Sequence, residues 1–341
     1  MKKSRFRYLI FDIEDVLLQR FRIIFFMKRI AFVFAVLLCV TAFVSCNKSG
    51  VYNPKDKLSK VWFEKESVVI IDSVEHKNPS VEKYLREEWL WDGNFLNSRT
   101  VFRSNHDVWY NYKYEYNKKN LIVGITTAEK GTRIRFIYDD DKRLLKEIKY
   151  YTELFPDAEQ PYRKLELTYD GKKLMSIKET INTQRYPRNA YNEISLLPYL
   201  VSEEMAASIE ANMISEKVEA DQTTNEYAFE WEKKNITNVK ITTKKGENTT
   251  ETTISYTYDD NRNPQMARVM GLVEDATVSP LICSHNNVVS CTYEGQNMTY
   301  TEECQYTYDK KTPVEKIVTR EEKTSVSTSK ITEKWSYEYV E

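Results

Sequence analysis

The sequence predicts an all-β fold, an antiparallel meander of β-hairpins that forms an extended, curled sheet with one α-helical insertion. Two observations predict it. Tyr, Thr, Val and Ile recur in alternation with charged residues, which is typical of half-buried strands. A short unit with paired aromatic residues also recurs along most of the chain, which contains 24 tyrosines among its 341 residues. The elements are taken below in chain order.

Residues 1–26 form a basic, amphipathic leader that ends just before a second possible start, Met27. Export signals need no such leader. We interpret residues 1–26 as a start-site misassignment or an N-terminal extension.

Residues 27–45 have the features of an export signal. Lys28 and Arg29 supply a short positive region, and no charge follows from Ile30 to Ser45. This apolar run is shorter than the about 20 residues that a membrane-spanning helix needs. We therefore predict a signal peptide and not an anchoring helix.

The signal ends in Phe43-Val44-Ser45-Cys46, which resembles the lipobox of bacterial lipoproteins, although that family prefers leucine at the position of Phe43. The resemblance implies that Cys46 is the lipid-attachment residue. Several acyl chains, at about 0.8 kcal/mol per buried methylene, would hold the protein on a membrane, in this case the outer membrane. Residues 46–60 are then a linker. The run from Asn47 to Gly50 lacks acidic residues, which favours the periplasmic side, and the surface-exposed side stays open.

The mature chain is mildly acidic. Removing residues 1–45 takes away eight of the 50 basic and three of the 51 acidic residues, which leaves a formal net charge of −6. A nucleic-acid-binding protein is expected to have a basic footprint, so no nucleic-acid partner is predicted. We expect residues 61–341 to be a single β domain.

The repeated unit reads aromatic, any residue, aromatic, acidic or Asn, then a short polar turn and two apolar residues. Because residues i and i+2 lie on one face of a strand, the two aromatics share a face, and the following Asp or Asn can start a turn. The returning strand supplies apolar residues to the same face. The copies begin at Trp89, Tyr114, Phe136, Leu167, Phe229, Tyr256, Tyr306 and Tyr337.

This pattern resembles the YD-repeat of Rhs-like proteins, and in particular uncharacterised lipoproteins of gut Gram-negative anaerobes. The most similar segments are Tyr256 to Pro264, Ser284 to Val289 and Cys291 to Glu294. The resemblance implies an array of hairpins and offers no established activity.

One segment, residues 194–218, departs from the pattern. The residues at helical spacing are Leu197, Leu200, Val201, Met205, Ile209 and Met213. Ser202 stands as an N-cap before two glutamates. We predict a helix over about residues 202–217 whose apolar stripe packs on the sheet.

Three cysteines follow the proposed anchor: Cys283, Cys291 and Cys304. A tight hairpin at Gly295 would place Cys291 and Cys304 four residues out of register, beyond the reach of a disulfide. We predict no bridge between these two, and the other pairings stay open.

No metal site, cofactor or catalytic constellation is predicted. The three histidines, His76, His106 and His285, are scattered without a second ligand at suitable spacing. The run from Asp259 begins like a calcium loop but has Pro264 where glycine is required. Carboxylates are abundant, yet no pair is singled out by the sequence.

Exposed aromatics are the candidate ligand contacts. Trp89, Trp91, Trp109 and Tyr112 lie within two neighbouring hairpins, and aromatic faces suit sugar rings or a protein partner. We therefore expect a lipid-anchored envelope protein that is a non-catalytic binding or structural module for a glycan or an envelope protein. The alternative is a carbohydrate-active enzyme, a glycoside hydrolase at the envelope, with two carboxylates about 5–9.5 Å apart in a cleft.

Overall fold

The computed structural model describes residues 52–341 apart from 55, 72–73, 79, 128, 130, 140–143, 154–159, 183–195, 202–204, 207–208, 210–221, 264–283, 295–298, 324–326 and 341. The described residues belong to one compact unit, residues 49–341. The predicted leader, the signal peptide, Cys46 and Cys283 lie outside the described residues.

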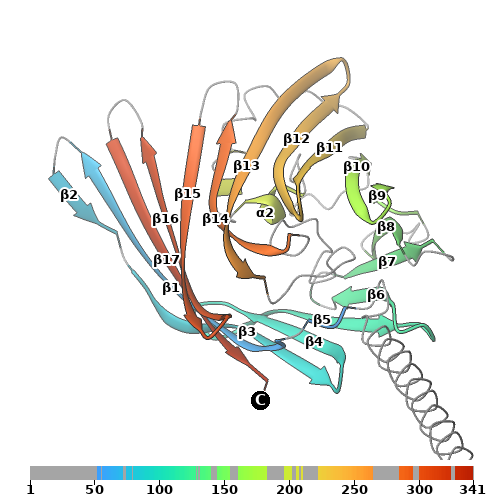
Figure 1. The fold of residues 1–341 in the computed structure, drawn as a ribbon, viewed down its shortest axis with the longest axis horizontal. Coiled ribbons are helices and arrows are strands. Elements are labelled where there is room, and N and C mark those ends of the chain that lie inside the picture. The colour runs from blue at the N-terminus through green and yellow to red at the C-terminus, as the bar shows by residue number, and fades with distance from the viewer. Residues whose placement is uncertain are drawn as a thin grey trace, which may run out of the picture. The chain divides into compact units, whose positions relative to one another are not determined.

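Seventeen antiparallel strands are described (Figure 1). They are β1 (Leu58–Ile71), β2 (Val74–Lys77), β3 (Val81–Asp92), β4 (Phe95–Phe102), β5 (Val108–Tyr116), β6 (Ile122–Thr127), β7 (Thr132–Tyr138), β8 (Leu145–Thr152), β9 (Arg163–Asp170), β10 (Lys173–Asn182), β11 (Gln222–Glu232), β12 (Asn235–Lys245), β13 (Asn248–Arg262), β14 (Asn286–Glu294), β15 (Thr299–Asp309), β16 (Thr312–Lys323) and β17 (Ser327–Tyr339).

The sheet closes on itself, so the predicted open, extended sheet is wrong. From β3 to β17 each strand pairs with the next one along the chain, and β1 pairs with both β3 and β17. All described strands except β2 therefore form a closed antiparallel barrel of sixteen strands, and β2 extends the wall along the end of β1. The first and last strands join along nearly their whole length, from Leu58 opposite Tyr339 to Ile71 opposite Ser327. Strand twist accumulates from hairpin to hairpin, and closure leaves no long unpaired edge.

Several predicted hairpins are confirmed at the predicted turns. Gly93 and Gly171 follow an aspartate at the tips of β3–β4 and β9–β10, and both have positive φ, which favours glycine. Asp259 differs, because β13 continues past it to Arg262. Its side chain accepts hydrogen bonds from the backbone N–H groups of Asn261 (3.0 Å) and Asn287 (3.1 Å), so it joins two strands and starts no hairpin.

Aromatics near strand ends tie each hairpin to the strand before it. We call them the bridging aromatics, because each donates a hydrogen bond to a backbone carbonyl near the start of the neighbouring strand. They are Trp91 to Leu58 (2.7 Å), Tyr116 to Leu96 (2.8 Å), Tyr138 to Ile122 (2.7 Å), Trp231 to Leu174 (2.7 Å), Tyr258 to Ile236, and Tyr339 to Pro313 (2.7 Å). A partly buried Tyr or Trp needs such a partner for its polar end. The second aromatic of the unit therefore links hairpins as well as packing on the core.

Alkaline pH is expected to unfold the barrel through these phenols. Burial raises the pKa of Tyr116, Tyr138 and Tyr339 above the ordinary value of 10.0. The unfolded chain then loses phenolic protons before the folded chain does, so this contribution is intact below about pH 10 and is lost as the pH rises further. Urea unfolding at a series of pH values, with tyrosinate absorbance recorded alongside, measures it. Tyr138→Phe should reduce the pH dependence relative to wild type; an unchanged slope in that variant would contradict the assignment.

The barrel interior is a hydrophobic core. Alternate residues of the strands are buried, as in β11, where Tyr227 and Phe229 point inward between the exposed Glu226, Ala228 and Glu230. Barrels of this strand number often enclose a water-filled channel. Here the buried side chains of β1 and of β3 to β14 form one cluster, in which Tyr112, Tyr150 and Tyr227 are among the largest fully buried members.

The connection between β10 and β11 adds to this core. Its described part contains the short helix α2 (Leu197–Leu200), and Leu197, Met205 and Ile209 are buried in the same cluster as the strands. The Tyr256 hydroxyl donates a 2.7 Å hydrogen bond to the Leu200 carbonyl, which holds the segment against β13 (Figure 1). The predicted insertion is corrected in its start, because the single turn α2 precedes 202. Within the predicted range of about 202–217 the described residues Met205, Ala206 and Ile209 are helical and buried, and the others lie outside the described residues.

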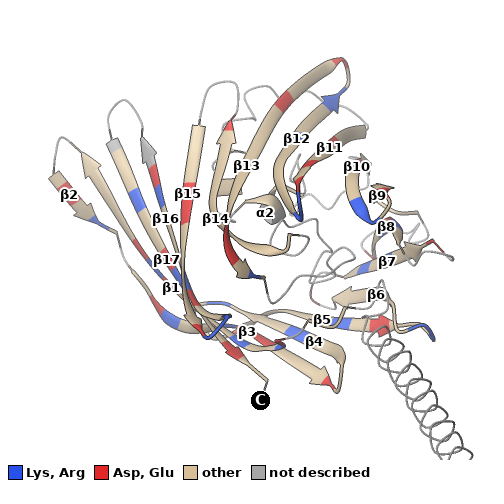
Figure 2. Cartoon of the chain, in the orientation of Figure 1, with Lys and Arg blue, Asp and Glu red and all other residues tan. Residues whose placement is uncertain are grey.

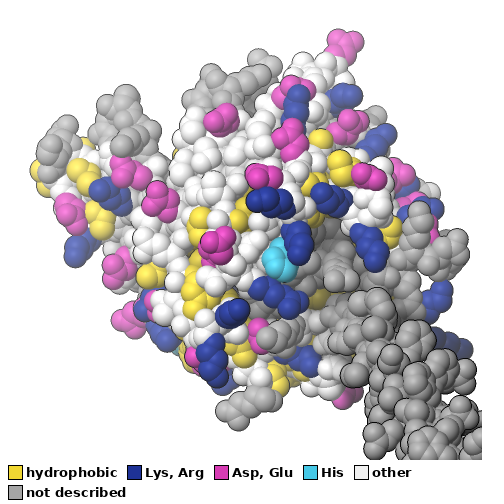
Figure 3. All heavy atoms as spheres, in the orientation of Figure 1, with side chains coloured by type: hydrophobic (Ala, Val, Ile, Leu, Met, Phe, Trp, Pro, Cys, Tyr) yellow, Lys and Arg dark blue, Asp and Glu magenta, His cyan; other side chains and the backbone are white. Residues whose placement is uncertain are grey.

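The outer wall of the described strands is mostly polar, with single exposed hydrophobic residues such as Leu90, Ile137 and Met175. The outward residues of β13 and β15 are Glu251, Thr253, Ser255, Thr257, Thr301, Glu303, Gln305 and Thr307. Cross-strand ion pairs cover the wall, for example Lys240 with Glu251 (3.0 Å) and Lys334 with Glu315 (2.8 Å). Charged residues occur along the strands in Figure 2, and hydrophobic side chains are interrupted by polar ones on the face drawn in Figure 3. A membrane-spanning barrel has the opposite polarity, with an apolar outer band about 25 Å tall.

The cysteine prediction is confirmed for one pair, although its register was wrong. Cys291 and Cys304 are both buried and free. Cys291 lies opposite Glu302, so the two cysteines are two residues out of register and not four. Burial raises the pKa of both thiols, which keeps them protonated and unreactive.

Candidate functional site

Three buried arginines are the main polar groups of the barrel interior. Arg99, Arg163 and Arg320 are at most 6% exposed, and each pairs with a buried or nearly buried glutamate. Buried charges are tolerated only where such partners compensate their desolvation. These clusters are therefore the candidate catalytic or binding groups of the interior.

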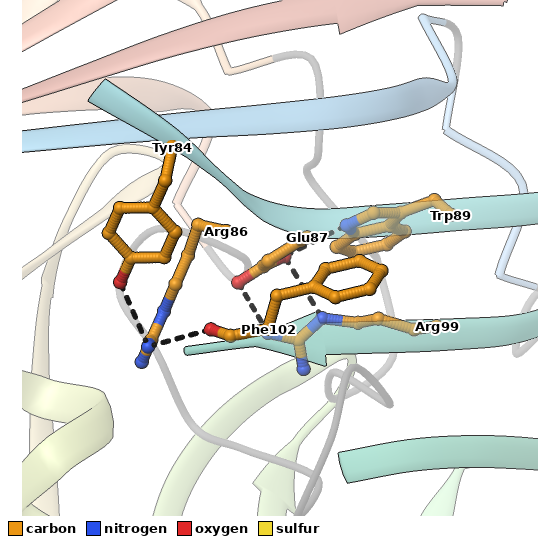
Figure 4. Close-up of polar contacts among 6 residues, drawn as sticks. All are labelled: Tyr84, Arg86, Glu87, Trp89, Arg99 and Phe102. Carbon is orange, nitrogen blue, oxygen red and sulfur yellow. Dashed lines mark hydrogen bonds and ion pairs between the residues drawn. The ribbon is translucent and has the colours of Figure 1, made fainter. Parts of the chain in front are cut away.

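The cluster around Arg99 lies on β3, β4 and β5 (Figure 4). Arg99 donates to both oxygens of Glu87, at 2.6 and 3.0 Å, and the Trp89 indole N–H donates to the same carboxylate at 2.8 Å. The guanidinium also lies 5.4 Å from the centre of the Trp89 ring and 5.6 Å from that of Tyr112. The sheet register places Arg99 between these rings, because it is opposite Trp89 on one side and Tyr112 on the other. The Glu87 carboxylate is thus fully engaged.

The cluster around Glu179 is the most deeply buried. Its carboxylate, which is 0% exposed, accepts hydrogen bonds from Arg163 (2.6 Å), Asn225 (2.8 Å) and Tyr227 (2.8 Å). Arg163 stacks on Tyr150, with the guanidinium 4.2 Å from the ring centre. Burial and the nearby Glu179 carboxylate raise the pKa of Tyr227 well above its ordinary value, so its hydroxyl remains a donor.

The third cluster places Arg320 between Glu302 (3.2 Å) and Glu333 (2.8 Å), which lie on the flanking strands β15 and β17. Each carboxylate in the three clusters is bound to an arginine. A glycosidase acid must instead keep a proton to donate. The clusters are therefore arranged to hold the barrel wall together, and they do not form the acid and nucleophile pair of the alternative prediction.

A fourth arginine and aromatic cluster, which we call the Trp109 site, lies at the β4–β5 turn. Trp109 is half-buried, packs against the core and stacks on Tyr110 with ring centres 4.9 Å apart. Two guanidiniums approach its ring, that of Arg86 at 5.2 Å and that of Arg103 at 5.7 Å.

The local backbone builds the Trp109 site. A register shift between Val101 and Phe102 displaces the start of β5, where Trp109 and Tyr110 are consecutive. The turn from Arg103 is closed by two hydrogen bonds of 2.9 Å, Arg103 N–H to the Asp107 carbonyl and His106 N–H to the Arg103 carbonyl. His106 has φ of 69° and is exposed, so it is a turn residue.

The four residues predicted to contact a ligand have different environments in the structure. Trp89 is 5% exposed and Tyr112 is 0% exposed, so both belong to the core around Arg99. Trp91 is half-buried, and its indole N–H is one of the bridging hydrogen bonds. Trp109 lies beside the exposed Arg103, and the Lys57 ammonium lies 5.8 Å from the centre of the Trp91 ring.

Sequence reasoning missed both arginines of the Trp109 site. Arg86 lies on β3 and Arg103 follows β4, 23 and 6 positions before Trp109. Arg103 and Trp109 lie on either side of a short polar turn, and this spacing was the local signal that could have identified Arg103. Arg86 could not be found locally, because sheet pairing brings it to the turn.

No family model and no curated protein match this chain. Among solved structures, a porin-like protein from Bacteroides uniformis has a TM-score of 0.47 and 11% identity, and the match covers 86% of this chain and 100% of that one. A porin-like protein from Bacteroides vulgatus has a TM-score of 0.42 and 12% identity, over 84% of this chain and 99% of that one. None of the helices among the described residues has the length and apolar character needed to cross a membrane.

The predicted relation to YD-repeat lipoproteins is wrong. The strand pairing of this chain closes a barrel where the resemblance implied an open array of hairpins. The paired aromatics that suggested the relation have a different role here, as bridging aromatics within the barrel wall.

Proposed function

We propose that the protein is a lipid-anchored component of the cell envelope whose barrel stands in water and acts as a non-catalytic binding module. The polarity of the wall is the observation that carries this proposal. Lys, Glu and Thr predominate on the outward face, and most of the large aromatic and aliphatic residues face the lumen. A wall of this kind belongs in water, since lipid-facing strands require an apolar band. Attachment to the membrane is then the role of Cys46.

The arginine clusters support a binding role over hydrolysis. The buried carboxylates are occupied by Arg99, Arg163 and Arg320, while the Trp109 site offers an aromatic and cationic surface beside an exposed turn. We place ligand binding at the Trp109 site, and the rest of the barrel serves as its rigid support.

The anchor has a direct test. Cells that produce the full chain are labelled with a palmitate analogue, and we expect label in the wild-type protein and none in Cys46→Ala. In parallel, the chain from Asn47 is exported behind a cleavable signal that lacks a lipobox. That chain should leave the membrane fraction without detergent, because its outer wall is polar. Labelling that survives in Cys46→Ala would overturn the anchor, and a detergent requirement for the unlipidated chain would overturn the water-facing barrel.

The binding role is tested by incubating the same unlipidated chain with polysaccharides and with envelope extracts. We expect retention of the protein on at least one of them, and weaker retention of Trp109→Ala. If neither material retains the protein, the proposed binding function fails.

A further inference from the structure

We infer that one end of the barrel, the end at which β1 begins and β17 ends, docks on the anionic lipid headgroups of the membrane that holds the lipid anchor. We call it the anchor end. It contains Leu58 and Tyr339 and the turns of the hairpins β3–β4, β5–β6, β7–β8, β9–β10, β11–β12 and β15–β16, because successive connections of an antiparallel barrel alternate between its ends. Docking at this end presupposes the anchor proposed above and sets how the barrel stands on the membrane.

The chain enters the barrel at the anchor end, shortly after the proposed anchor. Tyr52 is 2% exposed and stacks on Trp91, with ring centres 6.0 Å apart. Lys57 donates a 2.8 Å hydrogen bond to the side chain of Asn94 in the β3–β4 turn. Five residues separate Tyr52 from Cys46, so the extended chain between them reaches at most about 22 Å. An anchored barrel therefore keeps this end close to the headgroups.

Basic residues are concentrated in the hairpin turns of the anchor end. Counted from the last residue of one strand to the first residue of the next, the six turn segments of this end contain ten basic and seven acidic residues. The six turn segments of the opposite end, in the hairpins β1–β2, β4–β5, β6–β7, β12–β13, β14–β15 and β16–β17, contain four basic and five acidic residues. The excess at the anchor end comes from adjacent lysines, which are Lys118 and Lys119, Lys172 and Lys173, Lys233 and Lys234, and Lys310 and Lys311.

The turn lysines differ from the lysines of the outer wall. On the wall, Lys240 and Lys334 pair with glutamates of neighbouring strands, at 3.0 and 2.8 Å. Lys172, Lys233 and Lys310 are exposed, and none of them has an ion pair within the part of the chain that the structure describes. Their charges are therefore available to phosphate groups, which lysine binds as a compact point charge.

Two of these lysines occupy a backbone conformation that suits glycine. Lys233 and Lys310 have φ of 54° and 56°, and the equivalent residue of the β9–β10 turn is Gly171, with φ of 60°. A residue with a Cβ atom is strained in this left-handed region, whereas glycine is not. Lysine thus stands at both turn tips against the local backbone preference, and strain of this kind is concentrated at functional sites.

The positive charge extends to the connection between β13 and β14. The backbone N–H of His285 donates a 3.2 Å hydrogen bond to the Lys234 carbonyl. Burial, and then the positive charges of Lys234 and Arg262, lower the pKa of His285. Lys and Arg side chains gather around a histidine on the face drawn in Figure 3. A potential that opposes protonation of an imidazole also attracts the phosphates of anionic lipids.

Docking orients the barrel and does not replace the anchor. A basic residue at an anionic membrane surface strengthens binding roughly fivefold, and salt screens the attraction within about 8–10 Å. The unlipidated chain therefore leaves the membrane at physiological salt, whereas in the anchored chain the same charges set the orientation. The β4–β5 turn, with the Trp109 site, then faces away from the membrane.

The test follows the acetylation of single lysines in the lipidated protein. The protein is inserted into preformed phosphatidylcholine vesicles, with or without phosphatidylglycerol, and treated with a membrane-impermeant acetylating reagent; mass spectrometry gives the rate at each lysine. With phosphatidylglycerol, we expect Lys172, Lys233 and Lys310 to react about fivefold more slowly than with phosphatidylcholine alone. The rates at Lys240 and Lys330 on the outer wall should be equal in the two vesicles. High salt should abolish the difference at the turn lysines.

Charge-matched variants isolate the contribution of the anchor end. Lys233→Gly/Lys310→Gly removes two charges at positions whose φ suits glycine, so it should unfold at about the same urea concentration as wild type. It should lose most of the protection of Lys172. Lys240→Gln/Lys330→Gln removes the same net charge from the outer wall and should keep that protection.

The outcomes separate docking from the anchor. Equal rates in the two vesicles at the turn lysines overturn docking while the anchor stands, because the vesicles still hold the protein. Protection of the wall lysines in place of the turn lysines overturns the orientation. If the protein does not enter the vesicles, the anchor fails, and sedimentation of the unlipidated chain with phosphatidylglycerol vesicles at low salt decides docking. Binding then supports the docking surface, and the absence of binding overturns it too.

Discussion

Replacing Glu179 by alanine is expected to lower the free energy of unfolding by about 3–5 kcal/mol, since it leaves a buried cation without its partner. The carboxylate is fully buried and accepts hydrogen bonds from Arg163, Asn225 and Tyr227. Alanine would strand all three donors in the core, where each unsatisfied polar group adds its own desolvation cost. Urea unfolding followed by circular dichroism measures the loss.

Two controls define the result. Glu147 pairs with Lys149 (3.0 Å) and Lys164 (3.9 Å) on the outer wall, and Glu147→Ala should cost less than about 1 kcal/mol because solvent screens these pairs. The double variant Arg163→Met/Glu179→Leu removes both charges and should recover a large part of the stability lost in Glu179→Ala. A single variant as stable as wild type would show that the network is not buried as described.

Replacing one residue by lysine on each face of the β7–β8 hairpin is expected to affect the free energy of unfolding very differently on the two faces. Ile148 is 0% exposed and faces the core, and Ile137 is 39% exposed and lies opposite Glu147. Ile148→Lys should cost several kcal/mol, at least about 4, because it removes a buried side chain and places a charge in an apolar lumen. Ile137→Lys should stay within about 0.5 kcal/mol of wild type, since water and Glu147 solvate the new charge.

The comparison also tests the environment of the wall. In a barrel that spans a bilayer, an outward lysine costs about 2–4 kcal/mol at the midplane, while the lumen accepts charge. Thermal and urea unfolding of the two variants, prepared without detergent, distinguish the cases. A tolerated Ile148→Lys together with a destabilising Ile137→Lys would reverse the assignment of inside and outside.

Local sequence predicted much of the wall and little of the site. Alternation identified the core-facing aromatics of the hairpins, and Asp-Gly pairs identified turns at Gly93 and Gly171. The same alternation is satisfied by an open sheet, which is why the predicted fold was an array and not a barrel. Trp109 was found because it is aromatic and near a turn, whereas its partner Arg86 is brought there by the β3–β4–β5 pairing.

The insertion shows the same limit. Apolar residues at helical spacing predicted a helix packed on a sheet from 202. The structure has the single turn α2 before that point, and the described residues Met205, Ala206 and Ile209 after it are helical. Sequence periodicity indicates which apolar residues would share one face of a helix. It does not report that Leu197 and Ile209 enter a closed lumen, where packing against opposite strands decides the backbone.

The sequence by itself determined that the chain forms strands, where several hairpins turn, and which residues of each strand share a face, because these depend on neighbours within a few positions. Only the tertiary structure decided closure, the identity of inside and outside, and the partners of the buried charges. Closure joins Trp62 to Glu338 by a 2.6 Å hydrogen bond across 276 positions, and Glu179 meets Tyr227 across 48. Such contacts depend on the twist summed over all the strands, and no local pattern contains that sum.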